Sequence, residues 1–93
     1  MNEHFQVRVF ELNHGLTVYD EIKLVRIISK DYNLLVMVDY LPLLGEFDGN
    51  IDIKGNNVDI SFKNIKGFYM NSNNVFNLMI NGEENEQIPS DNS

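Results

Sequence analysis

Apolar and polar side chains alternate one by one through most of this chain, in short runs. Near the start, Phe5, Val7 and Val9 alternate with Gln6 and Arg8. Because successive side chains of a β-strand point to opposite faces, a period of two predicts half-buried strands rather than helices. Segments rich in Asn and Gly separate the runs, and both residue types tolerate the positive φ angles of tight turns. The pattern therefore predicts an all-β protein.

The same reasoning predicts strands along most of the chain. Residues 22–28 fit either a helical stripe or a strand, and their β-branched residues favour the strand. The continuous apolar run at residues 34–38 is typical of a strand that is buried on both faces or lies at the centre of a sandwich. Short strands at regular spacing favour a two-sheet β-sandwich of about eight to ten strands. The other expected strands cover residues 5–9, 16–19, 51–53, 58–62, 67–70 and 75–80.

The length of 93 residues provides one domain. Residues 83–93 contain almost no apolar side chains, so we expect a sandwich domain at residues 1–82 and a disordered acidic tail at residues 83–93. No run approaches the roughly 20 apolar residues of a membrane-spanning helix. The polar, acidic N-terminus does not resemble a secretory signal, and we expect a cytoplasmic protein that does not insert into a membrane.

Charge and composition exclude several functions. The formal net charge of -7 disfavours contact with phosphate backbones, so we expect no nucleic-acid partner. The absence of cysteine excludes disulfides, thiolate zinc sites and cysteine nucleophiles. His4 and His14 have no carboxylate pair at metal-ligand spacing, and no serine lies in a nucleophile-elbow motif. We expect no catalysis, no metal and no cofactor. Tyr32 and Tyr40 flank expected loops, where each ring could serve an interface or pack the loop.

Three stretches together resemble one family. Residues 40–53 contain Tyr-Leu-Pro-Leu-Leu, then a glycine and an alternating strand. The family pattern that they resemble is His-Ala-Pro-Leu, followed by Leu-x-x-Gly and an alternating strand. Residues 67–78 resemble a strand beginning Gly-Gly-Phe, a polar turn and an Asn-x-Val-x-x-Leu strand, and residues 5–20 resemble the opening strand and a short Tyr-containing segment. Their order and spacing are similar to those of the N-terminal β-sandwich of the epsilon subunit of rotary F-type ATP synthases.

The resemblance implies a non-catalytic central-stalk subunit that binds a gamma-type shaft, turns with it and transmits torque. The c-ring, or a replacement for it, is implied as a further partner, and the alpha and beta catalytic subunits as indirect ones. Such a protein would be peripheral to the cell membrane through its complex. By matching positions, the shaft-side residues are Glu11, Tyr40, Leu43 and Gly45, and the residues facing the base are Asp31, Tyr32 and Asn33.

The chain also departs from the family pattern. The family's helical C-terminal hairpin, which brakes ATP hydrolysis and senses ATP, has no counterpart here, so we expect neither inhibition nor nucleotide binding. In the ring-facing loop, Leu35 and Asp39 stand where the family has glycines. These differences and an AT-rich residue bias favour a divergent, mycoplasma-like F-type-like assembly that is not coupled to a proton channel. The alternative is a free-standing β-sandwich adaptor or ligand-binding module, which requires an exposed aromatic platform or a concave site.

Overall fold

The computed structural model describes residues 5–83, which form strands and no helix. The expected all-β class is confirmed, and residues 22–28 lie in a strand rather than a helix. No helix among residues 5–83 is long and apolar enough to span a membrane. The strands are β1 (Gln6–Glu11), β2 (Gly15–Tyr19), β3 (Ile22–Ser29), β4 (Asn33–Met37), β5 (Leu43–Gly55), β6 (Asp59–Ser72) and β7 (Val75–Glu83).

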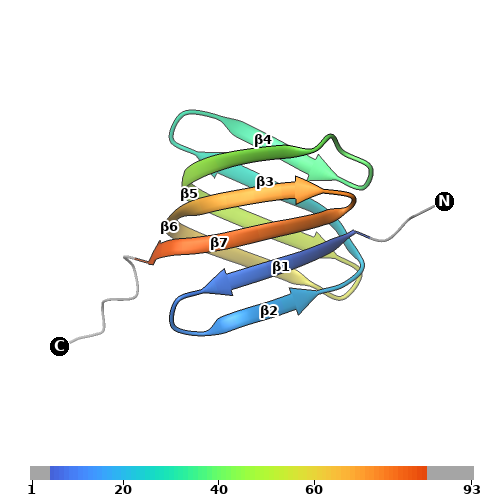
Figure 1. Cartoon of the computed structure of the whole chain (residues 1–93), viewed down its shortest axis with the longest axis horizontal. Helices are drawn as coiled ribbons and strands as arrows, with labels where there is room; N and C mark the ends of the chain where they lie inside the picture. The colour runs from blue at the N-terminus through green and yellow to red at the C-terminus, as the bar shows by residue number, and fades with distance from the viewer. Residues whose placement is uncertain (1–4, 84–93) are drawn as a thin grey trace.

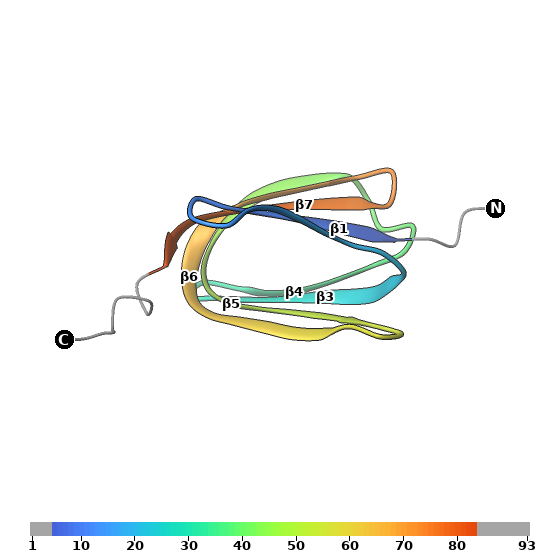
Figure 2. The same cartoon turned by 90° about the horizontal axis from the view of Figure 1, so that it is seen from below.

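All seven described strands belong to one hydrogen-bonded sheet with the order β2-β1-β7-β6-β5-β3-β4 (Figure 1). Neighbouring strands are antiparallel except for β1 and β7, which are parallel. The sheet folds over itself because β5 and β6, with 13 and 14 residues, curve from one layer into the other (Figure 2).

The halves of the two long strands serve different layers. The first half of β5 and the second half of β6 lie with β7, β1 and β2, and we call these the β1 layer. The second half of β5 and the first half of β6 lie with β3 and β4, and we call these the β3 layer. The described strands thus supply five segments to the β1 layer and four to the β3 layer. This is the sandwich that the sequence predicts, built from fewer and longer strands.

The bend of the long strands coincides with local departures from regular β geometry. The β5–β6 register shifts after Gly49, and the β6–β7 register shifts before Gly67. Asn64 has a φ of 58°, and its backbone N–H donates to Oδ1 of Asn50 at 3.1 Å. A Cβ on Gly49 would clash with the carbonyl oxygen of Ile28, so glycine lets β5 pass close to β3. Bulges bend and twist a strand. We therefore infer that these residues allow β5 and β6 to bend from one layer into the other.

The core lies between the two layers and consists of alternate residues of the strands. Phe5 and Phe76 are its largest fully buried side chains. The ring of Phe76 stacks on that of Tyr69, with centroids 5.6 Å apart. The β6–β7 hairpin closes through Asn73 and Asn74, with φ of 53° and 63°, the left-handed conformation expected of two-residue hairpin turns. The alternation that predicts strands therefore also identifies the inward-facing residues.

One expectation about burial is wrong. Residues 34–38 were expected to form a strand that is buried on both faces or lies at the centre of a sandwich, but β4 lies at an edge of the sheet. Val36 is fully buried, whereas Leu35 is 38% and Met37 46% exposed. The β3 layer has no further layer outside it in residues 5–83, so the outward side chains of β4 stay uncovered.

The expected domain boundary falls near the end of the described residues. Strand β7 extends through Glu83, the first residue of the expected tail. Residues 84–93 of that tail lie outside the described residues, as does His4. The expectation of a disordered tail therefore stays a prediction.

Candidate partner-binding face of the sandwich

Apolar side chains form a row across the outer surface of the β1 layer. Strand pairing places Leu16 of β2 opposite Phe10 of β1, Phe10 opposite Met79 of β7, and Met79 opposite Phe68 of β6. Their side chains are 49%, 53%, 46% and 44% exposed, in the order Leu16, Phe10, Met79 and Phe68. Neighbouring strands are about 4.8 Å apart, so the row is continuous.

A second row lies beside the first and is partly polar. It runs from Val18 through Arg8, Asn77 and Met70 to Leu44. Leu44 is 75% exposed. We call the exposed apolar residues of both rows the outer apolar face; its members are Phe10, Leu16, Val18, Leu44, Phe68, Met70 and Met79.

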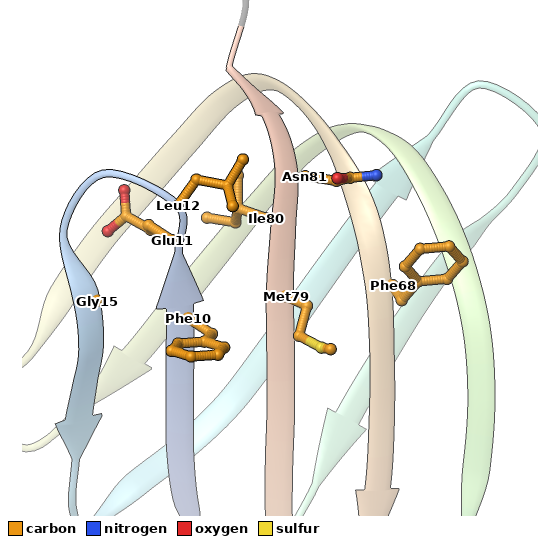
Figure 3. Close-up of a pocket in the computed structure, with 8 residues that line it drawn as sticks. All are labelled: Phe10, Glu11, Leu12, Gly15, Phe68, Met79, Ile80 and Asn81. Atoms are coloured by element: carbon orange, nitrogen blue, oxygen red, sulfur yellow. The ribbon is translucent and has the colours of Figure 1, made fainter.

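The outer apolar face borders a hollow of about 520 Å³. In Figure 3, Phe10, Met79 and Phe68 lie across three neighbouring strands, and Leu12 extends from the turn after β1. Exposed Met and Phe side chains around a depression are characteristic of protein-binding surfaces, because such residues gain most from burial and adapt to a partner's shape. Contiguous exposed apolar residues often serve interactions, so this face is the candidate partner-binding surface.

The structure separates the four residues predicted for the shaft side. Glu11 is half-buried and lines the hollow. Tyr40 and Leu43 are half-buried and pack against the core. Gly45 faces inward, since a Cβ there would lie 2.5 Å from the Tyr69 hydroxyl. Strands β7 and β6 lie between β1 and β5, so Glu11 is remote from the other three, and the role of all four in binding stays a prediction.

The three residues predicted for the base form the turn between β3 and β4 and the start of β4. Asp31 and Asn33 are exposed. Tyr32 is half-buried, and its hydroxyl donates to the backbone carbonyl of Glu46. The hydroxyl oxygen of Tyr32 also lies 2.8 Å from the hydroxyl oxygen of Tyr69. The hydroxyl of Tyr32 thus ties the turn between β3 and β4 to the β1 layer, and the base-facing role of Asp31, Tyr32 and Asn33 stays a prediction.

The Tyr32–Tyr69 contact has a defined direction. Because the Tyr32 proton is committed to the Glu46 carbonyl, Tyr69 must donate to the Tyr32 oxygen. Burial raises the pKa of Tyr69 well above its ordinary value, and this hydrogen bond raises it further. The pair is thus a structural link that favours the neutral form of Tyr69.

Within residues 5–83, no group of three or more His, Asp or Glu side chains is placed to hold a metal ion. His14 is exposed in the turn between β1 and β2. The scattered carboxylates are partly engaged in surface contacts, such as that of Asp59 with Lys54 at 3.0 Å.

Sequence reasoning did not identify the outer apolar face. Phe10 lies out of phase with Val7 and Val9, which face inward. Met79 is likewise out of phase with Phe76 and Leu78, which are fully buried. An apolar residue on the polar side of an alternating strand is the signal that could have found this surface.

Comparison with known proteins identifies a structural neighbour of this chain. No protein-family model matches this sequence, and no curated protein matches it. A chain in the cryo-EM structure of the Tetrahymena thermophila mitochondrial ATP synthase central stalk and c-ring matches with a TM-score of 0.70. The match covers 92% of this chain and 75% of that chain, at 11% sequence identity. The sandwich therefore shares its fold with a chain of an ATP synthase central stalk and c-ring assembly.

Proposed function

We propose that this chain is a non-catalytic rotor subunit of an F-type or F-type-like rotary ATPase that binds a gamma-type shaft. The observation that carries the proposal is the shared fold over 92% of the chain with a chain of a central stalk and c-ring structure. The sequence resemblance to the epsilon N-terminal sandwich supports it independently, since it rests on residue patterns rather than on backbone shape. Torque transmission needs a stiff body, and a close-packed sandwich provides one.

The outer apolar face is the surface that we assign to the shaft. Burying one exposed Met or Phe side chain stabilises a complex by about 1–2 kcal/mol, and the face offers four of these together with two leucines and a valine. Arg8 lies within the second row and Glu46 ends the first row, so polar groups accompany the apolar centre. An apolar centre with polar groups at its margin is the usual anatomy of a stable interface.

Finer assignments follow from the sequence. We propose an epsilon-like subunit in a divergent assembly that is not coupled to a proton channel. In this proposal the protein resides in the cytoplasm, peripheral to the cell membrane through its complex. The turn containing Asp31 would face the c-ring or its replacement.

A second candidate function is a free-standing ligand-binding module. The hollow of about 520 Å³ beside Phe10 and Phe68 is the concave site that such a module requires, and its volume is within the range of small-molecule sites. This candidate predicts a protein that is stable alone and has no affinity for a coiled-coil shaft.

Capture of a gamma-type subunit by the full-length chain tests the first proposal. The variant is Met79→Asp in the outer apolar face, and the matched control is Met37→Asp in β4, since both methionines are 46% exposed. We expect Met79→Asp to weaken capture at least tenfold, as for a hot-spot residue, and Met37→Asp to leave it unchanged. Equal capture by the two variants, or no capture by the wild type, would contradict the proposal.

A further inference from the structure

Strand β4 presents hydrogen-bonding groups to the edge of the sheet. Ser29 and Tyr32 exchange two backbone hydrogen bonds, from Ser29 N to Tyr32 O at 2.8 Å and from Tyr32 N to Ser29 O at 3.4 Å. In an antiparallel pair such bonded positions alternate with positions whose groups point away from the neighbour. Given the β3–β4 register, the residues whose backbone N–H and C=O point away from β3 are Asn33, Leu35 and Met37.

Nothing in the sequence of this edge blocks a further strand. Natural proteins blunt sheet edges with charged residues, prolines or bulges. Residues 33–38 contain no charge and no proline, and the β3–β4 register shows no shift. The Met37 carbonyl is used by the N–H of Tyr40 at 3.2 Å, which leaves the groups of Asn33 and Leu35 and the N–H of Met37 directed outward.

A side-chain pocket lies beside the edge. The hollow of about 240 Å³ is lined by Arg26, Ile28, Asn33, Leu34 and Leu35. When an extended segment adds to a sheet edge, backbone hydrogen bonds supply affinity and pockets for alternate side chains supply specificity. The edge of β4 combines unpaired backbone groups with a side-chain pocket. It lies on the β3 layer, away from the outer apolar face.

The charges near β4 disfavour a second copy of this chain as the added strand. Asp31 precedes the strand and Asp39 follows it, and both are exposed. The Asp39 carboxylate accepts a hydrogen bond from the amide of Asn74 at 3.0 Å, which holds it in place. Lys30 is engaged with Asp48 at 3.3 Å rather than with Asp31. Antiparallel pairing of two copies would bring Asp31 of each toward Asp39 of the other, and like charges in opposed positions are destabilising.

We propose that the edge of β4 is a second protein-binding site, which takes an extended segment of a different protein by strand addition. The segment has an uncharged, alternating centre that pairs with Asn33 and Leu35, and Lys or Arg at both ends that face Asp31 and Asp39. One apolar side chain of the segment enters the hollow beside Ile28. The site is independent of the shaft interface, because it lies on the other layer.

The experiment is a titration of the full-length chain with a blocked peptide, Lys-Thr-Val-Thr-Val-Thr-Lys, followed by amide NMR shifts. We expect saturable shifts centred on residues 33–37 and about tenfold weaker binding when both lysines are replaced by glutamates. Leu35→Pro should abolish binding, because it removes an outward N–H and places a ring in the path of the added strand. The backbone hydrogen bonds between β4 and β3 remain in this variant, since the N–H of Leu35 does not bond to β3. Leu35→Thr keeps the outward N–H, so it should still bind saturably, unlike Leu35→Pro, although it shortens an apolar side chain that lines the hollow.

Each other outcome overturns the proposal. No saturable shift with the lysine peptide, equal binding of the lysine and glutamate peptides, or undiminished binding by Leu35→Pro would each do so. A concentration-dependent dimer that Leu35→Pro dissolves would assign the edge to a second copy instead. Leu35→Pro should still capture a gamma-type subunit, so failure here is distinguishable from failure of the proposed function.

Discussion

Replacing Tyr32 by Phe should destabilise this protein more than replacing Tyr69 by Phe, although the two hydroxyls contact each other. Tyr69 is 5% exposed, so its hydroxyl has little access to water. In Tyr32→Phe, the Glu46 carbonyl loses its donor and the Tyr69 proton loses its acceptor. One lost hydrogen bond and one buried unsatisfied hydroxyl together cost about 2–4 kcal/mol.

Tyr69→Phe removes only one hydrogen bond. Tyr32 keeps its bond to the Glu46 carbonyl, so the expected cost is about 1 kcal/mol. The double variant no longer carries a buried unsatisfied hydroxyl. Its cost should therefore fall below the sum of the single costs by about 1 kcal/mol or more, since contacting residues are not additive.

Urea unfolding of the wild type, the two single variants and the double variant measures these costs. A common m-value is required before the midpoints are converted to free energies. Tyr69→Phe costing as much as Tyr32→Phe, or strict additivity in the double variant, would refute the inferred direction of the hydrogen bond.

The same pair predicts a dependence on alkaline pH. The pKa of Tyr69 is raised in the folded protein, so the folded state holds its proton more tightly than the unfolded state, where the pKa is about 10. This contribution to stability is fully present below about pH 10 and is lost as pH rises further, at up to about 1.4 kcal/mol per pH unit. The stability difference between wild type and Tyr69→Phe should be constant below pH 9 and should shrink above pH 10. A difference that grows with pH would contradict the assignment.

Three further substitutions test other parts of the structure by thermal or urea unfolding. Gly67→Ala should cost about 3 kcal/mol or more, because the new Cβ would clash with the backbone oxygen of Met79 and the strands themselves must separate. Gly45→Ala should lower the free energy of unfolding by about 1–3 kcal/mol, because the ring of Tyr69, which occupies the space, has to move. Unchanged stability with lost capture of a gamma-type subunit would instead assign Gly45 to an interface. Lys54→Ala should change stability by less than about 1 kcal/mol, because its ion pair with Asp59 is solvent-exposed, and a larger loss would show that the pair does more than the structure indicates.

Local pattern was sufficient to predict the strands and much of the core. Alternation identifies Val7 and Val9 as inward-facing, and the structure buries both fully. The Asn-rich turn before β7 was also predictable, because few residues other than Asn and Gly adopt two successive positive φ angles. The resemblance to the epsilon sandwich came from the same short-range patterns and led to a fold that the structural comparison supports.

The candidate surfaces were not predictable in the same way. Phe10 and Phe68 lie on the outer face on either side of Met79, on strands that are distant in sequence. Leu35 and Met37 were expected to be buried, and the free edge of β4 became visible only from the strand order.

The sequence by itself determined which residues form strands and which side of each strand is apolar, because both follow from the chemistry of neighbouring residues. Only the tertiary structure decided which strands pair, that β1 runs parallel to β7, and that β5 and β6 bend through both layers. Those outcomes depend on close backbone contacts such as that of Gly49 with Ile28, between residues far apart in the chain. A period of two indicates which face of the strand a side chain occupies, but it does not indicate which strand pairs with it or which layer packs against it.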